Sequence, residues 1–269
     1  MQWENLTSSE FKRARVRTGV CLLGVGCVEK HGEHLPLGTD FLNVHHYCVK
    51  AAEKEPAVVF PPYYFGQIQE ARCFPGTVAV EPVLLYRFFL ALLDEISRNG
   101  FRKIILVNGH GGNCGFLEYA CRGLIARPRE SSVYLFDLQN RLTPEQEEIR
   151  KKLMARPGGG HGDEDETSVT LAGFPELVRM DRILPEKMGK RNTRLDGILK
   201  QCARTTLSWY AAYPNHYAGN ASAATREKGE RLLEMRVKTL AAFIRAVKRD
   251  RVMPALTREF NRRAGSLGR

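Results

Sequence analysis

The sequence predicts an α/β fold: one three-layer domain in which a mostly parallel sheet is flanked by helices. Short apolar runs alternate along the chain with longer amphipathic stretches, which is the pattern of repeated βα units. No linker is long enough to divide the 269 residues into two domains. We therefore expect one domain over residues 1–269, with its functional loops at the carboxyl ends of the strands.

The expected strands are short apolar runs, and they cover residues 19–28, 57–60, 103–107 and 132–136. The expected helices cover residues 40–53, 81–98, 115–126, 143–155 and 225–249. Asn99 and Gly100 form a helix-stop signal after the second of these helices. Thr143 followed by Pro144 is typical of a helix start. Residues 157–160 are expected to form a flexible loop.

The composition excludes several classes of protein. No apolar run approaches the roughly 18 residues needed to span a bilayer, and the N-terminus lacks the basic and apolar regions of a secretory signal. Seven scattered cysteines without a C-x-x-C pair argue against a disulfide framework and against a cysteine zinc site. We expect most of the cysteines to be buried apolar residues, in a protein of the reducing cytoplasm.

The net charge of +11 is concentrated near the C-terminus, because residues 245–269 carry eight basic and two acidic side chains. We interpret this segment as a solvated helix end followed by a basic tail from about residue 250. A basic tail can also contact nucleic acid or an acidic partner. No RNA-binding aromatic motif, zinc finger or helix-turn-helix pattern accompanies the charge, so nucleic-acid binding is not the favoured interpretation.

Three polar clusters carry the candidate chemistry, and the first follows the strand expected at residues 19–28. Glu29 and His31 are two residues apart, so on an extended strand their side chains would point to the same side. Asp40 follows in the next loop or at the start of a helix. Two carboxylates and an imidazole at one strand end form a plausible set of ligands for a divalent metal ion. The alternative is that these residues are solvated loop residues.

The second cluster runs from Asn108 to Asn113 and also follows an apolar strand. Its three glycines allow close backbone approach, and a glycine-rich turn before a helix can bind an anion. The sequence is neither G-x-G-x-x-G nor a Walker motif, so nucleotide binding is disfavoured. We expect this turn to present His110 at the end of the strand.

The third cluster, residues 161–168, places His161 before four acidic residues that open an apolar run. An acidic first helical turn is favoured by the helix dipole, which can account for residues 163–165. At least one carboxylate remains free to be a ligand. The other histidines that lack such a setting, His45, His46 and His216, are expected to be structural or surface residues.

Together these clusters resemble the creatininase family. Residues 29–40 match the family pattern E-x-H-G-x-H-L-P-x-x-T-D, and residues 108–113 match its N-G-H-G-G-N form. Residues 161–168 are a close variant of H-x-G-E-x-E-T-S, and residues 74–77 match the F-P-G-T element. The resemblance extends from about residue 19 to the helix that ends at residue 249, and it implies the creatininase-like fold.

The resemblance also implies two divalent metal ions per chain, Zn with Zn, Mn or Fe. Glu29 and His110 would bind one ion, His31 and Glu166 the other, and Asp40 would bridge them. His161 would be the catalytic residue that transfers a proton to the leaving nitrogen or steadies the tetrahedral intermediate. The implied reaction is hydrolysis of a non-peptide or cyclic amide C–N bond of a small molecule. The implied assembly is a homo-oligomer, commonly a hexamer, without a membrane partner.

Departures from the family pattern predict a substrate other than creatinine. Creatininase has a glutamate where this chain has Gly112, and it uses tryptophans near its substrate. Here neither Trp3 nor Trp209 lies in the stretch that leads to His161. Ala71 replaces a frequent histidine, and we hypothesise that the adjacent Arg72 favours an anionic group. The alternatives are a diverged member that hydrolyses a lactone or a C–C bond or trims a peptide, and a non-catalytic metal-binding or nucleic-acid-binding protein.

Overall fold

A parallel four-stranded sheet lies at the centre of the computed structural model, which describes residues 1–137, 142–155 and 160–266. The strand order is β2-β1-β3-β4. The strands are β1 Val20–Val25, β2 Val58–Val59, β3 Lys103–Asn108 and β4 Ser132–Asp137. Leu23 pairs with Leu106, and Leu106 pairs with Leu135, so the three longer strands end at the same edge of the sheet. The prediction of a parallel α/β sheet is confirmed.

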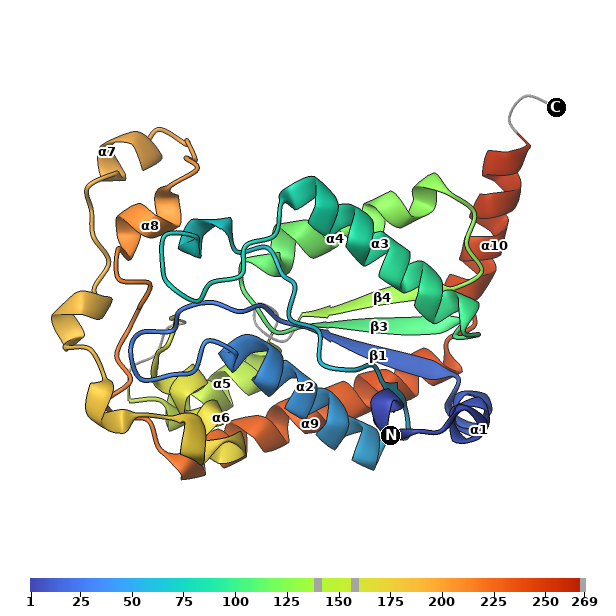
Figure 1. The fold of residues 1–269 in the computed structure, drawn as a ribbon, viewed down its shortest axis with the longest axis horizontal. Coiled ribbons are helices and arrows are strands. Elements are labelled where there is room, and N and C mark those ends of the chain that lie inside the picture. Colours follow the sequence, from blue (N-terminus) through green and yellow to red (C-terminus); the bar gives the residue numbers. More distant parts are fainter. Residues whose placement is uncertain (138–141, 156–159, 267–269) are drawn as a thin grey trace.

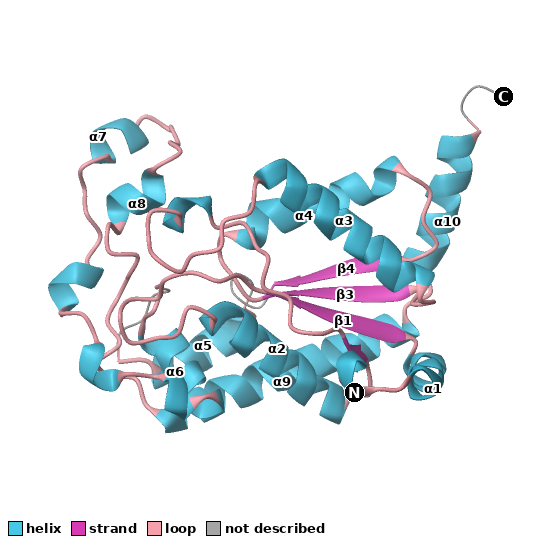
Figure 2. Ribbon diagram, viewed as in Figure 1, coloured by secondary structure: helices cyan, strands magenta, loops and turns pink. Residues whose placement is uncertain are grey.

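Helices cover both faces of this sheet, which gives the three layers seen in Figures 1 and 2. One face packs against α3 (Pro82–Arg98) and α4 (Asn113–Gly123), and the other against α2 (Thr39–Lys54) and α9 (Arg226–Arg249). Successive side chains of a strand point to opposite faces, so alternate residues of β1 enter different cores. Leu22 packs with the core around α2 and α9, whereas Leu23 packs with the core around α3 and α4.

Local capping sets the ends of several helices. Thr143 accepts a hydrogen bond from the backbone of Gln146, whose side chain in turn accepts one from the backbone N–H of Thr143, and Pro144 is the first helical residue. This confirms the helix start that the sequence predicts. The carboxylate of Glu81 caps α3 through the N–H groups of Val83 and Leu84.

The remaining helices complete the shell. They are α1 Ser8–Thr18, α5 Pro144–Leu153, α6 Glu164–Gly173, α7 Asp196–Leu199, α8 Ser208–Ala212 and α10 Val252–Gly265. Short 3₁₀ turns lie at Trp3–Asn5, Gln69–Ala71, Leu124–Ala126, Pro175–Leu177, Met180–Arg182 and Glu186–Gly189. No helix in the described part of the chain is long and apolar enough to cross a membrane.

Two segments differ from the sequence predictions, and a third is not described. The first strand ends at Val25, not at residue 28, because the chain turns away from the sheet toward α2. The segment expected to be a basic tail from about residue 250 contains α10, which contacts β4. The flexible loop expected at residues 157–160 lies outside the described residues except for Gly160.

The close contact between α6 and α9 can be tested by substitution of Gly229. A methyl group on Gly229 would overlap the carbonyl oxygen of Ser168 in α6, whereas one on Gly115 in α4 meets nothing within 4 Å. We expect Gly229→Ala to destabilise the fold by roughly 1–3 kcal/mol through overpacking. Gly115→Ala should be neutral or stabilising by up to about 1 kcal/mol, since alanine favours helix. Urea unfolding of both variants measures the difference, and equal midpoints would contradict the close contact.

Candidate metal centre

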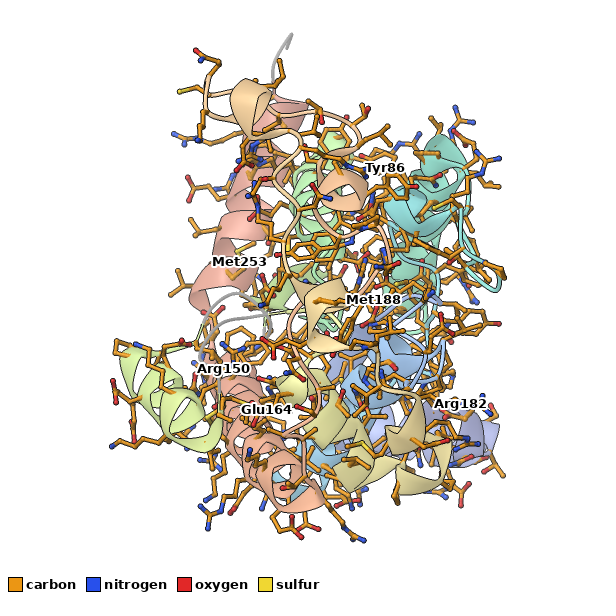
Figure 3. The ribbon with its side chains drawn as sticks, turned by 90° about the vertical axis from the view of Figure 1, so that its left-hand side faces the viewer. Tyr86, Arg150, Glu164, Arg182, Met188 and Met253 are labelled. Carbon is orange, nitrogen blue, oxygen red and sulfur yellow. The ribbon has the colours of Figure 1, made fainter. Side chains whose placement is uncertain are left out.

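The predicted site residues meet at the carboxyl edge of the sheet. Glu29 and His31 follow β1, His110 follows β3, and Asp40 lies in the first turn of α2. His161 and Glu166 arrive from the opposite side, before and within the first turn of α6. These strand ends point to the left in Figure 1, and Figure 3 views the molecule from that side, with Arg150 and Glu164 among the residues it labels. All six residues therefore converge although they are up to 137 positions apart in the sequence.

Asp40 occupies the centre of the cluster. Its Oδ1 lies 3.2 Å from Nε2 of His31, and its Oδ2 lies 3.0 Å from Nδ1 of His110. His110 Nδ1 is also 2.8 Å from Oε1 of Glu29, and His31 Nε2 is 3.8 Å from Oε2 of Glu166. The two oxygens of Asp40 thus face two separate pairs of donor atoms.

The backbone after β1 brings Glu29 and His31 together, although not through the strand alternation that their spacing predicts. Both residues lie beyond the strand, so strand alternation does not explain their common direction. The N–H of Glu29 donates to the carbonyl of Leu37, and Gly32 has a φ of 66°, which reverses the chain with little strain. A tight loop, not an extended strand, therefore directs the two side chains to one point.

Backbone carbonyl groups orient the rings of His110 and His161. Nε2 of His110 lies 3.0 Å from the carbonyl oxygen of Gln67, and Nε2 of His161 lies 2.7 Å from that of Lys30. A carbonyl accepts but does not donate, so these nitrogens carry the ring protons. If a cation displaced the second proton of the ring, Nδ1 of His110 would be the electron-pair donor that a metal-binding histidine offers.

The electrostatics of the cluster favour bound positive charge. Burial alone would raise the pKa of Glu29, but His110 and His161 outweigh it and hold that pKa well below its usual value. Burial would lower the pKa of His31, yet the Asp40 carboxylate raises it to about 10. For Glu166 burial dominates and raises the pKa to about 8. A divalent cation could take the place of the protons that these groups hold, because metal binding to such ligands releases protons.

The donor atoms fit divalent metal ions. Glu29, Asp40 and His110 lie close enough together to hold one ion, and His31, Asp40 and Glu166 form a second such group. Among the described residues, Oε1 of Glu29 is buried without a hydrogen-bond partner, which is costly unless a cation binds it. Within the described residues, the carboxylates of Glu29, Asp40 and Glu166 form ion pairs with histidines only. Nitrogen and carboxylate donors of this kind suit Zn, Mn and Fe.

One cysteine also lies in the cluster. The Sγ of Cys27 is 3.0 Å from Oδ2 of Asp40, and burial raises the pKa of this thiol well above its usual value. Cys27 is buried in polar surroundings, but the prediction that most cysteines are buried is wrong, because only Cys21, Cys27 and Cys48 of the seven are. As a neutral thiol it donates a hydrogen bond that holds the Asp40 carboxylate.

His161 lies over the cluster rather than in its centre. Its ring stacks on that of His31, with ring centres 4.1 Å apart and planes 27° apart. Burial, and then the charge of His31, lower the pKa of His161 to about 3, which favours the neutral ring. A neutral imidazole beside the donor atoms can accept a proton and pass it on.

Two residues of the site were not predicted from the sequence. His216 was expected to be structural or at the surface, but it is buried and its Nε2 lies 2.5 Å from Oε2 of Glu29. Trp209, in α8, lies edge-on to the ring of His161 with centres 5.7 Å apart, so a tryptophan does line the site. Neither residue belongs to a recognisable motif. Both lie more than 45 positions after His161 in the sequence, and the fold returns them to the site. His45 and His46 lie away from the cluster in α2, as expected.

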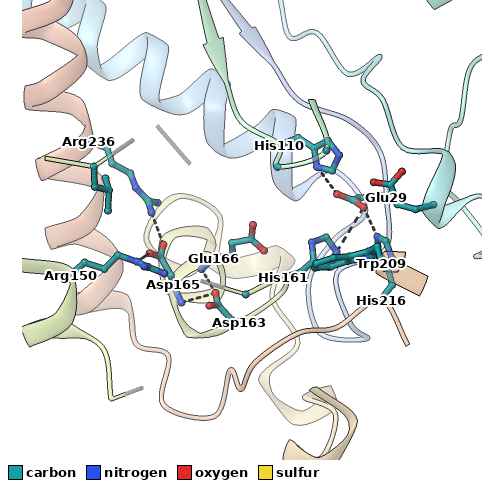
Figure 4. A pocket seen from close by; sticks show the side chains of 15 residues that line it. Glu29, His110, Arg150, His161, Asp163, Asp165, Glu166, Trp209, His216 and Arg236 are labelled. Atoms are coloured by element: carbon teal, nitrogen blue, oxygen red, sulfur yellow. Dashed lines mark hydrogen bonds and ion pairs between the residues drawn. The ribbon is translucent and has the colours of Figure 1, made fainter. Parts of the chain in front are cut away.

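A cavity of about 440 Å³ connects this cluster to a second polar group (Figure 4). At its far end Asp165 accepts hydrogen bonds from Arg150, at 2.8 Å, and from Arg236, at 2.7 Å. The hypothesis that Arg72 contacts an anionic substrate group finds no support here, because Arg72 is exposed and does not line the cavity. The loop that carries Arg72 turns that side chain to solvent.

The acidic first turn of α6 divides its carboxylates among different roles. Asp163 caps the helix through the N–H groups of Asp165 and Glu166, Glu164 pairs with Lys228, and Asp165 binds the two arginines. Glu166 points toward His31 and accepts a hydrogen bond from the N–H of Gly162. The sequence prediction that one carboxylate of this turn remains free for the site is consistent with this arrangement.

A three-layer α/β fold with a buried histidine–carboxylate cluster at the strand ends defines a class of protein that can activate water at metal ions. The family profile described as creatininase, creatinine amidohydrolase, matches residues 4–244. The chain therefore belongs to the creatininase family, and it is a hydrolase of that family.

Relatives of this chain differ in substrate. The creatinine amidohydrolase of Pseudomonas putida is 29% identical over 259 residues, which cover 89% of this chain and 94% of that protein. The 3-dehydro-scyllo-inosose hydrolase of Thermotoga maritima is 24% identical over 271 residues, which cover 91% of this chain and 83% of that protein. A solved creatininase, described as its Mn form, superposes with a TM-score of 0.75 at 26% identity, over 91% of this chain and 97% of that one.

Substitution of Gly111 and Gly112 tests how tightly the His110 ring is held. A methyl group on Gly112 would overlap Nε2 of His110, whereas one on Gly111 meets nothing within 4 Å. We expect Gly112→Ala to displace the ring and to lower the affinity for Zn²⁺ roughly tenfold or more. Gly111→Ala should bind Zn²⁺ like the parent protein. Competition with a chromophoric chelator measures both affinities, and an unchanged Gly112→Ala would show that the ring has room to move.

Proposed function

We propose that this chain is a binuclear metal-dependent amidohydrolase that cleaves a non-peptide or cyclic amide C–N bond of a small molecule other than creatinine. The observation that carries the proposal is the position of Asp40, whose two carboxylate oxygens face His110 and His31 separately. A carboxylate with one oxygen toward each of two donor groups is the expected bridge between two metal ions. Membership of the creatininase family supports the same assignment.

The proposed ligands divide into two sets that share Asp40. Glu29 and His110 would hold one divalent ion, and His31 and Glu166 the other. Zn with Zn, Mn or Fe suits these nitrogen and oxygen donors. When bound, such a pair of ions activates water and polarises a carbonyl group. The buried carboxylates would hold the ions, and the surrounding side chains would limit the access of bulk water.

His161 is the proposed proton-transfer residue. Its Nε2 donates to the carbonyl of Lys30, so Nδ1 is the nitrogen that can take up a proton from water and deliver it to the leaving nitrogen. Its ring lies between the cluster and Trp209, which forms part of the cavity wall. A substrate amide in the cavity would therefore be within reach of both the cluster and the imidazole.

Creatinine is an unfavourable substrate for this cavity. Gly112 stands where creatininase has a glutamate, and a side chain at this position would overlap His110. The different substrates of the two relatives support a family centre that is retained while the surrounding cavity changes. Hydrolysis of a lactone or of a C–C bond, or trimming of a peptide, would use the same centre. A panel of cyclic amides, linear amides, lactones and short peptides separates these reactions.

Other sequence predictions remain proposals. We propose a homo-oligomer, and sedimentation of the purified protein measures its size. A non-catalytic role through nucleic acid is not favoured, although residues 245–269 are basic. Salt-dependent binding of DNA or RNA that is lost on removal of residues after Arg245 would favour it instead. Cytoplasmic location also remains a prediction.

Metal content tests the bridging role of Asp40. The parent protein, purified without chelator, should contain two divalent ions per chain by elemental analysis, because two donor sets are present. Asp40→Ala should lose both ions since it removes a ligand common to both, whereas Glu166→Ala should lose one. Retention of two ions by Asp40→Ala would overturn the bridging role, and a parent protein that binds no added metal would overturn the proposed function.

Replacement of His161 tests its assignment as a proton-transfer residue rather than a ligand. His161→Ala should keep both ions and lower kcat on the best amide of the panel by about 10²–10⁴-fold, the usual range for loss of general acid–base catalysis. Elemental analysis and steady-state kinetics on the same preparation provide both readings. Loss of metal from His161→Ala would make it a ligand, and unchanged kcat would remove it from the mechanism.

A further inference from the structure

We infer that His216 is a positioning residue for Glu29: it holds the outer oxygen of this carboxylate, so that only the inner oxygen is presented to a metal ion. The inference rests on the proposed function and adds to it a residue outside the three sequence clusters. Figure 4 shows Glu29 between His110 on one side and His161 and His216 on the other. Each of its two oxygens has a different environment.

The distances separate the two oxygens of Glu29. Oε2 lies 2.5 Å from Nε2 of His216, which is hydrogen-bonding distance. Oε1 lies 2.8 Å from Nδ1 of His110 and is, within the described chain, buried without a hydrogen-bond partner. Nε2 of His161 is 3.8 Å from Oε2 and already donates to the carbonyl of Lys30. His216 is therefore the residue that holds Oε2, and Oε1 is the oxygen left for an ion.

Trp209 determines which nitrogen of His216 carries the proton. The indole Nε1 of Trp209 lies 3.2 Å from Nδ1 of His216. An indole N–H can only donate, so Nδ1 accepts and the proton of the neutral ring is on Nε2. Nε2 then donates to Glu29. The chain Trp209–His216–Glu29 resembles the hydrogen-bonded outer partners that fix the direction of metal ligands in other proteins.

The backbone of His216 is held in an unfavourable conformation. Its φ is 51°, in the left-handed region that non-glycine residues seldom adopt, and its side chain is buried, with 1% exposed. The N–H of His216 donates to the carbonyl of Tyr213, and its own carbonyl accepts from the N–H of Gly32, next to His31. Such strain persists where the surrounding contacts over-determine it, typically at functional sites. The loop of His216 is thereby tied to the loop that carries the ligands.

Only one of two bound ions should depend on His216. His216→Phe keeps a ring of similar shape but cannot donate to Glu29. We expect its affinity for Zn²⁺ to fall by about 10–100-fold at the site that contains Glu29, with the other site unchanged. His216→Gln restores an N–H donor and should recover most of the loss. Trp209→Phe leaves His216 in place but frees its ring proton, so it should give a smaller loss at the same site.

Stepwise Zn²⁺ titration of the full-length apoprotein against a chromophoric chelator measures the two affinities separately. Selective weakening of one site in His216→Phe, with recovery in His216→Gln, would support the positioning role. Two unchanged affinities in His216→Phe, or equal loss at both sites without recovery in His216→Gln, would overturn it. If His216→Phe does not fold, the Zn²⁺ affinities of Trp209→Phe and His216→Gln are compared with those of the parent protein. Equal affinities in these two variants, weaker than in the parent at both sites, would then overturn the positioning role. A parent protein that binds no Zn²⁺ would contradict the proposed function and not merely this role.

Discussion

The attraction between the buried carboxylates and imidazoles around Asp40 is the constraint on which the rest of the structure depends. Glu29 and His31 are 0% exposed, so their desolvation has to be offset by close charged neighbours. Asp40 is this neighbour for His31, and His110 is this neighbour for Glu29. The parallel sheet serves this arrangement, because β1 and β3 end side by side and release their loops at the same edge.

An outer layer of contacts then fixes the direction of each group. Carbonyl groups of Gln67 and Lys30 orient His110 and His161, and the loop after α8 brings His216 against Glu29. On the other side, Arg236 of α9 binds Asp165 in the turn that carries Glu166, and also the hydroxyl of Tyr47 in α2. The packing of α2, α6 and α9 is therefore coupled to the position of the candidate ligands.

The molecule can be divided into the candidate metal centre and the cavity wall around it. Membership of the creatininase family supports the proposed role of the first. Gly112, Trp209 and the arginine pair on Asp165 line the cavity and belong to the second. A centre that activates water and a carbonyl can act on several substrates, so substrate choice is left to the cavity wall.

The sequence by itself determined the fold class and most of the helix and strand positions, because apolar periodicity is a local property of the chain. Its short motifs, through their resemblance to the creatininase family, named the six residues that the structure brings together. It did not determine the loop geometry after β1, the helix α10, or the exposure of Arg72. Nor did it identify His216, Trp209 or the polar surroundings of Cys27. These depend on contacts between residues far apart in sequence, such as the bond of His216 to Glu29 across 187 positions. Only the tertiary structure decides such contacts, since no local pattern records which segments of the chain return to the same point.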